Sequence, residues 1–543
     1  MALLLTALLA PSLAHAAWQP GGNLIGNGDE FAAAESDGHI IVAWTKRLAS
    51  DRYQVWAMAW TAEGDPVAGW PSAGLLVSEL QIGYSYSPGI AEDGAGGAFV
   101  AWQSEESSVR HVLVQRITAA GAVAAGWAPE GLDLGPGRAA TLLPDGEGGV
   151  LVGLMESIAR FEVRVRILRI DASGAPHVSW PVGGYVIPSA WGPGLAVDGQ
   201  GHVFVSAIDY ELLSDPTRFD IQGIRVFRLD ENASPDPAWP EHGTLVTDEE
   251  NFVALSLFPD GSGGAYAAWL TAQVCPTGSN CGLIASRFAT RIRSDGVQDA
   301  GSIPAEAVYS VASDGAGGLL VGLVTGGRPG VLRLDGSGEV MAGWKAEGNA
   351  AMTETVDPWQ MEVAGDSEGG AFVAWIDTRT GEPRLYAARL DDQGRLATGW
   401  PGTGSFVGAS RVMPQYIQLA RVGAGSVIAL WRESTSTGYS GYITALRPGV
   451  PGPIVPPRPP GPGFGVVELR SNPARGPLTA FVGLQDGPAQ IHLIDVAGRV
   501  VESREFDFEH QPREAVTFNR ASALRAGVYW IRVSQGDKQA SRK

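Results

Sequence analysis

Residues 366–407 read DSEGGAFVAWIDTRTGEPRLYAARLDDQGRLATGWPGTGSFV, and this stretch contains the pattern that decides the fold. It begins with a glycine-rich turn, continues with an apolar run at Ala371–Trp375, and returns through a strand that ends near Arg389. A Trp-x-x-x-Gly segment from Trp400 to Gly404 closes the unit. Aspartate caps tight turns with its own carboxylate, and glycine adopts the positive φ that hairpin turns need. An apolar run on consecutive residues indicates a strand that is buried on both faces.

The same unit recurs along the chain, with a turn before each apolar run. Eight such runs are present, at Ile40–Trp44, Ala98–Trp102, Val150–Leu154, Val203–Ala207, Ala265–Trp269, Leu319–Leu323, Ala371–Trp375 and Val427–Trp431. Each unit has room for about four strands, which is the organisation of a propeller blade. We therefore predict an all-β fold in which residues 17–447 form an eight-bladed β-propeller. A seven-bladed ring is the alternative.

The two ends of the repeat region complement each other. The eighth unit has no Trp-x-x-x-Gly segment, but a spare copy runs from Trp18 to Gly22. A first strand that completes the last sheet would tie the termini together and leave no open edge. This pattern favours a closed ring over a solenoid, because a solenoid needs a distinct cap at each end.

Three further segments set the domain limits. Residues 1–16 have an apolar run and a small-x-small end, which is the layout of a secretory signal peptide. Residues 448–463 are rich in proline and glycine and predict an extended linker. Residues 464–543 read as short alternating strands, which predicts a small Ig-like β-sandwich. No other apolar run approaches the length of a membrane span, so we expect none in the mature chain.

Two family resemblances add to this interpretation. The repeat region resembles an uncharacterised repeat of exported bacterial proteins, which implies a propeller in the envelope or outside the cell. Residues 464–543 resemble the type A sorting domain of type IX secretion cargo and the related Ig-like domain of flagellar hook scaffolds. The residues that carry this second resemblance are Asn472, Pro473, Asp495, Gly498, Arg499, Gly527 and Tyr529.

The sorting-domain resemblance implies that secretion machinery exports the protein and that the domain can attach it to the outer cell surface. One departure from the family pattern is the missing apolar strand after the basic residues at Lys543. An ordinary accessory Ig-like module is therefore the alternative for this domain.

Composition and motifs exclude several kinds of chemistry. The net charge of −19 argues against nucleic acid, whose phosphates need a basic surface. The histidines are scattered singly, without the spacing of metal ligands, and no nucleophile motif stands outside the repeated turns. We expect no metal, no cofactor and no enzymatic activity. The two cysteines, Cys275 and Cys281, predict a structural disulfide in an exported protein, with free thiols as the alternative.

Repeated and non-repeated residues have different expected roles. The tryptophans that end the apolar runs are expected in the core, and the repeated arginines are expected to pair with turns. Five aromatic residues lie outside the repeat consensus and are the candidates for ligand binding: Tyr84, Tyr86, Trp191, Tyr210 and Trp359. We predict a secreted or surface protein that binds a glycan, a peptide or an envelope protein. A polysaccharide hydrolase or lyase with its site in the propeller funnel is the alternative.

Overall fold

The computed structural model describes residues 18, 22–48, 52–78, 88–106, 109–159, 162–212, 219–248, 252–273, 284–299, 308–366, 368–408, 414–423, 425–435, 438–447, 465–470, 478–483, 487–495, 499–508, 513–518, 529–535 and 538–542. The chain divides into two compact units, Met1–Ile454 and Val455–Lys543, and the division falls within the predicted linker. The predicted signal peptide lies outside the described residues, as do Cys275 and Cys281. Among the described residues no helix is long and apolar enough to cross a membrane.

The described part of the first unit consists of eight small antiparallel sheets. The first strands of the sheets are β2 (Phe31–Ser36), β6 (Gly89–Glu92), β10 (Arg138–Pro144), β14 (Ala190–Val197), β18 (Phe252–Pro259), β21 (Val308–Ser313), β25 (Gln360–Gly365) and β29 (Pro414–Val422). The second strands are β3 (His39–Arg47), β7 (Ala98–Glu106), β11 (Val150–Ala159), β15 (Val203–Leu212), β19 (Ala265–Gln273), β22 (Leu319–Thr325), β26 (Ala371–Asp377) and β30 (Ser426–Thr435).

The outer strands of each sheet follow in the same order. The third strands are β4 (Tyr53–Thr61), β8 (Val109–Ile117), β12 (Glu162–Ile170), β16 (Phe219–Leu229), β20 (Ile284–Ile292), β23 (Arg328–Leu334), β27 (Arg384–Leu390) and β31 (Gly438–Leu446). The fourth strands are β5 (Leu75–Leu76), β9 (Leu132–Pro136), β13 (Tyr185–Ile187), β17 (Thr244–Thr247), β24 (Asn349–Ala350), β28 (Ser405–Phe406) and, in the last sheet, β1 (Asn23–Asn27). The sheet of β18, β19 and β20 has three strands within the described residues.

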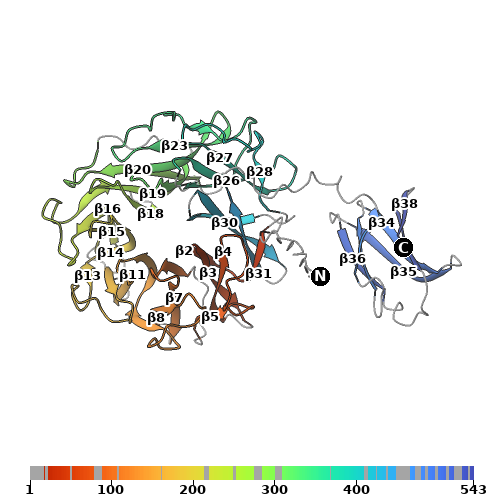
Figure 1. Ribbon diagram of the computed structural model, residues 1–543, viewed down its shortest axis with the longest axis horizontal. Coiled ribbons are helices and arrows are strands. Elements are labelled where there is room, and N and C mark those ends of the chain that lie inside the picture. Colours follow the sequence, from red (N-terminus) through yellow and green to blue (C-terminus); the bar gives the residue numbers. More distant parts are fainter. Residues whose placement is uncertain are drawn as a thin grey trace, which may run out of the picture. The chain divides into compact units, whose positions relative to one another are not determined.

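The eight sheets follow one another round a closed ring (Figure 1). Each first strand contacts the first strand of the next sheet, and β29 contacts β2, so the first strands are innermost. The strand β1 pairs with β31 antiparallel, with Asn23 opposite Ile443. The N-terminal strand therefore completes the last sheet, as the complementary ends of the repeat region predict.

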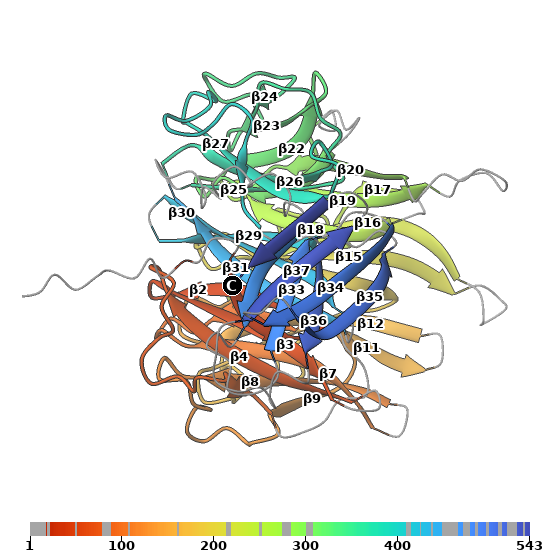
Figure 2. The same cartoon turned by 90° about the vertical axis from the view of Figure 1, so that its right-hand side faces the viewer.

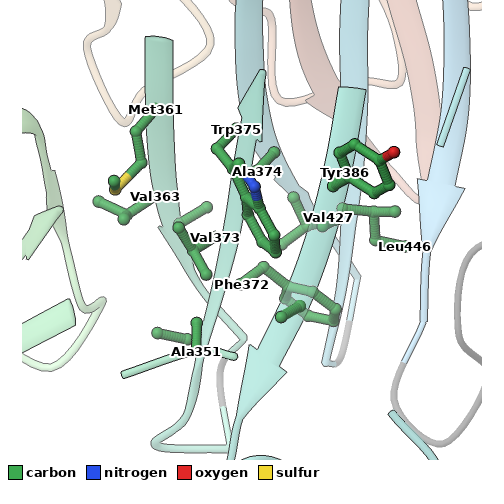
Figure 3. Close-up of a cluster of buried hydrophobic side chains, with 14 of the residues drawn as sticks. Ala351, Met361, Val363, Phe372, Val373, Ala374, Trp375, Tyr386, Val427 and Leu446 are labelled. Atoms are coloured by element: carbon green, nitrogen blue, oxygen red, sulfur yellow. The ribbon is translucent and has the colours of Figure 1, made fainter. Parts of the chain in front are cut away.

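The core lies between neighbouring sheets, where the predicted apolar runs are the second strands. The five tryptophans that end these runs are buried, as predicted: Trp44, Trp102, Trp269, Trp375 and Trp431. Figure 3 shows one such cluster, in which Trp375 lies among side chains of its own sheet and of the next. Burial of one large apolar side chain stabilises the fold by about 1.5–3 kcal/mol, so these layers hold the ring together.

The second unit contains two antiparallel sheets within its described residues. One has the order β32 (Gly465–Arg470), β33 (Leu478–Gly483) and β36 (Arg513–Phe518). The other has the order β35 (Val500–Phe508), β34 (Gly487–Asp495), β37 (Tyr529–Gln535) and β38 (Lys538–Arg542), and Figure 2 shows these strands side by side. Buried residues alternate along β37, at Ile531 and Val533, as expected for a strand with one face on a core.

Candidate binding face

The ring has two chemically different ends. The turns between first and second strands and the connections between third and fourth strands lie at one end, because neighbouring strands are antiparallel. The connections between second and third strands and the crossovers between sheets lie at the other. We name these the Asp-turn end and the crossover end. The turns that give the first its name begin at Asp93, Asp145, Asp260, Asp314 and Asp366.

Each Asp turn is held by a buried ion pair, and Asp314 is representative. Its Oδ1 accepts hydrogen bonds from the backbone N–H groups of Ala316 and Gly318, both at 2.7 Å. Its Oδ2 lies 2.8 Å from Nη2 of Arg333 on the third strand of the same sheet. Arg333 also donates to the Gly369 carbonyl in the next sheet. A Cβ at position 318 would lie 2.2 Å from a backbone oxygen, which explains the glycine there.

The same pair recurs in four other sheets. The nitrogen–oxygen distances are 2.8, 3.0, 2.7 and 2.6 Å for Arg116–Asp93, Arg169–Asp145, Arg291–Asp260 and Arg389–Asp366. The repeated arginines therefore pair with turns, as predicted from the sequence. A buried pair of this kind fixes the turn and joins neighbouring sheets. Each of its charges is neutralised by the other, so neither is available to a ligand.

Tryptophans of the Trp-x-x-x-Gly segments form a second set of links between sheets. Nε1 of Trp70 donates to the Ala119 carbonyl of the next sheet at 2.9 Å, and Trp127, Trp180, Trp239 and Trp344 make the equivalent bond. Trp18 makes it across the ring closure, to the Ala62 carbonyl at 2.9 Å. Most of the described polar groups at the Asp-turn end thus satisfy one another, although Nε1 of Trp400 is buried without a hydrogen-bond partner among the described residues.

A cavity of about 450 Å³ opens at the Asp-turn end between the third and fourth sheets. It is lined by Asp145 and Arg169, which are paired with each other, and by His202. His202 occupies the position of the last glycine in the other turns, and its Nδ1 lies 2.6 Å from Oδ2 of Asp198. Within the described ranges no group of three or more His, Cys, Asp or Glu side chains is arranged to hold a metal ion.

The crossover end presents aromatic side chains on three consecutive innermost strands. Trp359, directly before β25, is 46 % exposed, and Tyr416 on β29 is 57 % exposed. Tyr309 on β21 is half-buried. We name Tyr309, Trp359 and Tyr416 the aromatic arc.

Strand register places Tyr309 and Tyr416 near the same level and Trp359 nearer the crossover end. Met361 lies opposite Trp375 in its sheet, so Trp359 is two residues nearer the crossover end. Tyr309 lies in a bulge beside Val308, which is opposite Leu323. Tyr416 lies in a bulge between Gln415 and Gln418, opposite the region of Trp431. Trp375, Leu323 and Trp431 are each the last residue of their apolar run. Bulges commonly change the direction of side chains near functional sites.

Tyr416 is held in an unusual backbone conformation. Its φ is 52°, a left-handed value that side-chain-bearing residues rarely adopt. The guanidinium of Arg432 lies 3.7 Å from the centroid of the Tyr416 ring and 4.2 Å from that of Tyr439. Arg432 is buried and pairs with Glu30 at 2.9 Å. The exposed ring is therefore backed by a fixed cation, an arrangement that limits its motion.

The sequence-predicted aromatic residues fall into three groups. Trp359 belongs to the aromatic arc. Trp191 is half-buried and stacks on Tyr210, with ring centroids 5.1 Å apart. Tyr210 is only 2 % exposed, and its hydroxyl bonds to the N–H and carbonyl of Val163, both at 2.9 Å. The prediction that Tyr210 binds a ligand was wrong, because its hydroxyl group forms hydrogen bonds that join two sheets. Tyr84 and Tyr86 lie outside the described residues.

Sequence reasoning missed Tyr309 and Tyr416, although a spacing signal was present for Tyr416. Trp191, Trp359 and Tyr416 each precede the first residue of their Asp or Gly turn by seven positions (198 − 191, 366 − 359 and 423 − 416). An aromatic residue at this spacing begins an innermost strand at the crossover end. A count backwards from the turns finds Tyr416 but not Tyr309, which precedes Asp314 by five positions.

In the second unit, the described motif residues stabilise a turn and a strand pair. Arg499 donates its backbone N–H to Oδ1 of Asp495 at 3.0 Å, and its guanidinium pairs with Oδ2 at 2.8 Å. Tyr529 begins β37 directly opposite Asp495. The other motif residues, Asn472, Pro473, Gly498 and Gly527, lie outside the described residues.

Several solved structures are distantly similar to this chain. A protein of unknown function from Dyadobacter fermentans is 10% identical, with 78% of this chain and 96% of that chain covered and a TM-score of 0.36. A variant of the Synechocystis apocarotenoid oxygenase is 10% identical, with 72% and 95% covered and a TM-score of 0.35. An endo-1,4-β-xylanase from Bacteroides thetaiotaomicron is 9% identical, with 52% and 99% covered and a TM-score of 0.27. Likenesses at this level carry no argument about function.

Family comparison is informative for the second unit. No curated protein matches the chain. Residues 471–543 match the family described as the secretion system C-terminal sorting domain. This range includes Asp495, Arg499 and Tyr529, which support the match with a defined turn and strand pair. Residues 471–543 are therefore a C-terminal sorting domain of type IX secretion, and the protein is exported to the cell surface or the extracellular space.

Proposed function

We propose that this exported protein is a binding protein that takes its ligand at the crossover end of an eight-bladed β-propeller. In this proposal the eight sheets are the blades and the C-terminal unit is an Ig-like domain that engages the secretion machinery. The observation that carries the proposal is the exposure of Trp359 and Tyr416 on neighbouring innermost strands. Exposed aromatic residues on a rigid scaffold are the usual anchors of a binding surface.

Two buried carboxylates at the crossover end favour binding over hydrolysis. Asp377 and Glu433 are buried there and accept hydrogen bonds from Nε1 of Trp375 and Trp431, at 2.8 and 3.0 Å. Asp377 also pairs with Arg379 at 2.7 Å. Glycoside hydrolysis needs two carboxylates that can exchange protons with the substrate, and these two are engaged within their sheets. A polysaccharide hydrolase or lyase remains the alternative function.

The full exported chain tests this proposal. We expect it to sediment with cell-envelope material of the bacterium that makes it, and we expect the double variant Trp359→Ala/Tyr416→Ala to bind at least about tenfold more weakly. The matched control is Val178→Ala/Val182→Ala, which removes two almost fully exposed side chains at the Asp-turn end. Unchanged binding by the aromatic variant, or equal loss in the control, would contradict the proposal. Release of reducing sugar from the same material would support the hydrolase alternative.

A further inference from the structure

The aromatic arc has the chemistry of a sugar-binding surface. One face of a pyranose ring presents C–H groups that pack against an aromatic face, whereas its hydroxyl groups need donors and acceptors around the rim. Trp359 and Tyr416 provide exposed rings. An aromatic ring offers a large contact area with few rotatable bonds, and the indole N–H and phenol O–H remain as polar handles.

The second feature is the preorganisation of Tyr416. Its ring rests on the buried guanidinium of Arg432, and its backbone has a φ of 52°. A strained backbone persists only where the surrounding structure enforces it, and such residues cluster at binding and active sites. Because the ring is held before the ligand arrives, less conformational entropy is lost on binding.

Polar side chains beside the rings suit hydroxyl groups rather than charges. Gln360, next to Trp359, is exposed, and Gln415, next to Tyr416, is half-buried. An amide side chain both donates and accepts hydrogen bonds, which matches a hydroxyl group in either role. Asp357 is close enough to Tyr309 to contribute, after burial, to the raised pKa of that phenol. The carboxylate of Asp357 beside Tyr309 and the net charge of −19 both disfavour an anionic ligand.

From these contacts we infer that the aromatic arc binds an uncharged polysaccharide chain. The inference rests on the proposed binding function and names its ligand class. Trp359 and Tyr416 stack on sugar rings, and Gln360 and Gln415 bond to the hydroxyl groups beside them. A partner protein is the competing occupant of the same surface, and the experiment below separates the two.

The test uses affinity electrophoresis of the full exported chain in native gels. The neutral probes are laminarin, galactomannan, xyloglucan and dextran, and the acidic probes are polygalacturonate and alginate. We expect at least one neutral probe to retard the protein and both acidic probes to leave it unretarded. Trp359→Ala and Tyr416→Ala should each weaken retardation at least about tenfold, whereas Tyr416→Phe and the control Val178→Ala/Val182→Ala should retain it. Thermal unfolding of each variant checks that it is folded.

Two results would overturn the inference. One is retardation by acidic probes alone, and the other is neutral binding that neither aromatic substitution changes. Envelope material treated with periodate or with protease then separates this inference from the proposed function. Periodate destroys sugar diols, so loss of sedimentation after periodate supports a glycan. Loss after protease alone keeps the binding function but rejects the glycan, and no sedimentation with untreated material rejects both.

Discussion

The two ends of the ring are made by the same repeat and have opposite chemistry. At the Asp-turn end, Asp314 and Arg333 are paired and buried, and the equivalent pair recurs in four other sheets. At the crossover end, Trp359 and Tyr416 are exposed and follow no such pairing. A group that recurs in sheet after sheet and is satisfied internally holds the fold. Exposed side chains outside that pattern, such as Trp359 and Tyr416, are the candidates for contact with a ligand.

Backbone conformation shows the same difference. Glycines supply most positive φ values at the Asp turns, for example 79° at Gly315 and 88° at Gly317. At the crossover end Tyr416 has a φ of 52° despite its side chain. Glycine adopts this conformation without strain, and tyrosine does not. The turns are therefore relaxed, whereas the position of the Tyr416 ring is maintained at a cost in stability.

The largest expected effect comes from breaking an ion pair at the Asp-turn end. Asp314→Asn leaves Arg333 buried without its charge partner, so the free energy of unfolding should fall by about 3 kcal/mol. Asp37→Asn is the matched control, because Asp37 is exposed and its sheet has Trp60 where the sheet of Asp314 has Arg333. Urea denaturation measures the free energy of unfolding of both variants. Equal small losses would show that the pairs do not hold the ring.

A smaller loss is expected at the ring closure. Trp18→Ala removes the hydrogen bond to Ala62 and a half-buried indole, so the free energy of unfolding should fall by about 2 kcal/mol, less than for a fully buried tryptophan. Trp70→Ala removes the equivalent link inside the ring and serves as the comparison. If Trp18→Ala changes nothing while Trp70→Ala destabilises, the N-terminal segment does not close the ring.

At the crossover end, function and stability should separate. Tyr416→Gly removes the contact with Arg432 but relieves the positive φ, and the two effects oppose each other. We expect the free energy of unfolding to stay within about 0.5 kcal/mol of the parent, whereas ligand binding is lost. Chemical denaturation and envelope sedimentation measure the two quantities. A large destabilisation would show that Tyr416 is part of the structural frame.

The smallest effect is a pH dependence at the Asp-turn end. The hydrogen bond from the Ser173 hydroxyl, with backbone bonds from Ser173 and Ala175, lowers the pKa of Asp171. A lowered pKa in the folded state stabilises the protein above the ordinary carboxyl pKa, and this contribution is lost as pH falls through the folded value. Asp171→Asn should therefore lower Tm slightly at pH 6 and have no charge-related effect near pH 2. A Tm difference that does not change with pH would contradict this assignment.

The fold was largely predictable because its signals are local and repeated. The glycine at position 318 predicts a turn. The apolar run after it predicts a strand that is buried on both faces. The ends of the repeat region also predicted that an N-terminal strand completes the last sheet, which is the pairing of β1 with β31. The binding face was less predictable, because exposure depends on packing between sheets. Tyr210 lies outside the consensus and is nevertheless buried, and Tyr416 is exposed through a bulge that the sequence pattern does not show.

Hydrogen–deuterium exchange of the full exported chain tests most directly whether the ligand binds at the crossover end. The exchange is compared with and without solubilised envelope material that the protein binds. We predict slower exchange at the crossover ends of β21, β25 and β29, around Tyr309, Gln360 and Tyr416, and no change at the Asp turns. Protection confined to the Asp-turn end, around the cavity beside His202, would contradict the account.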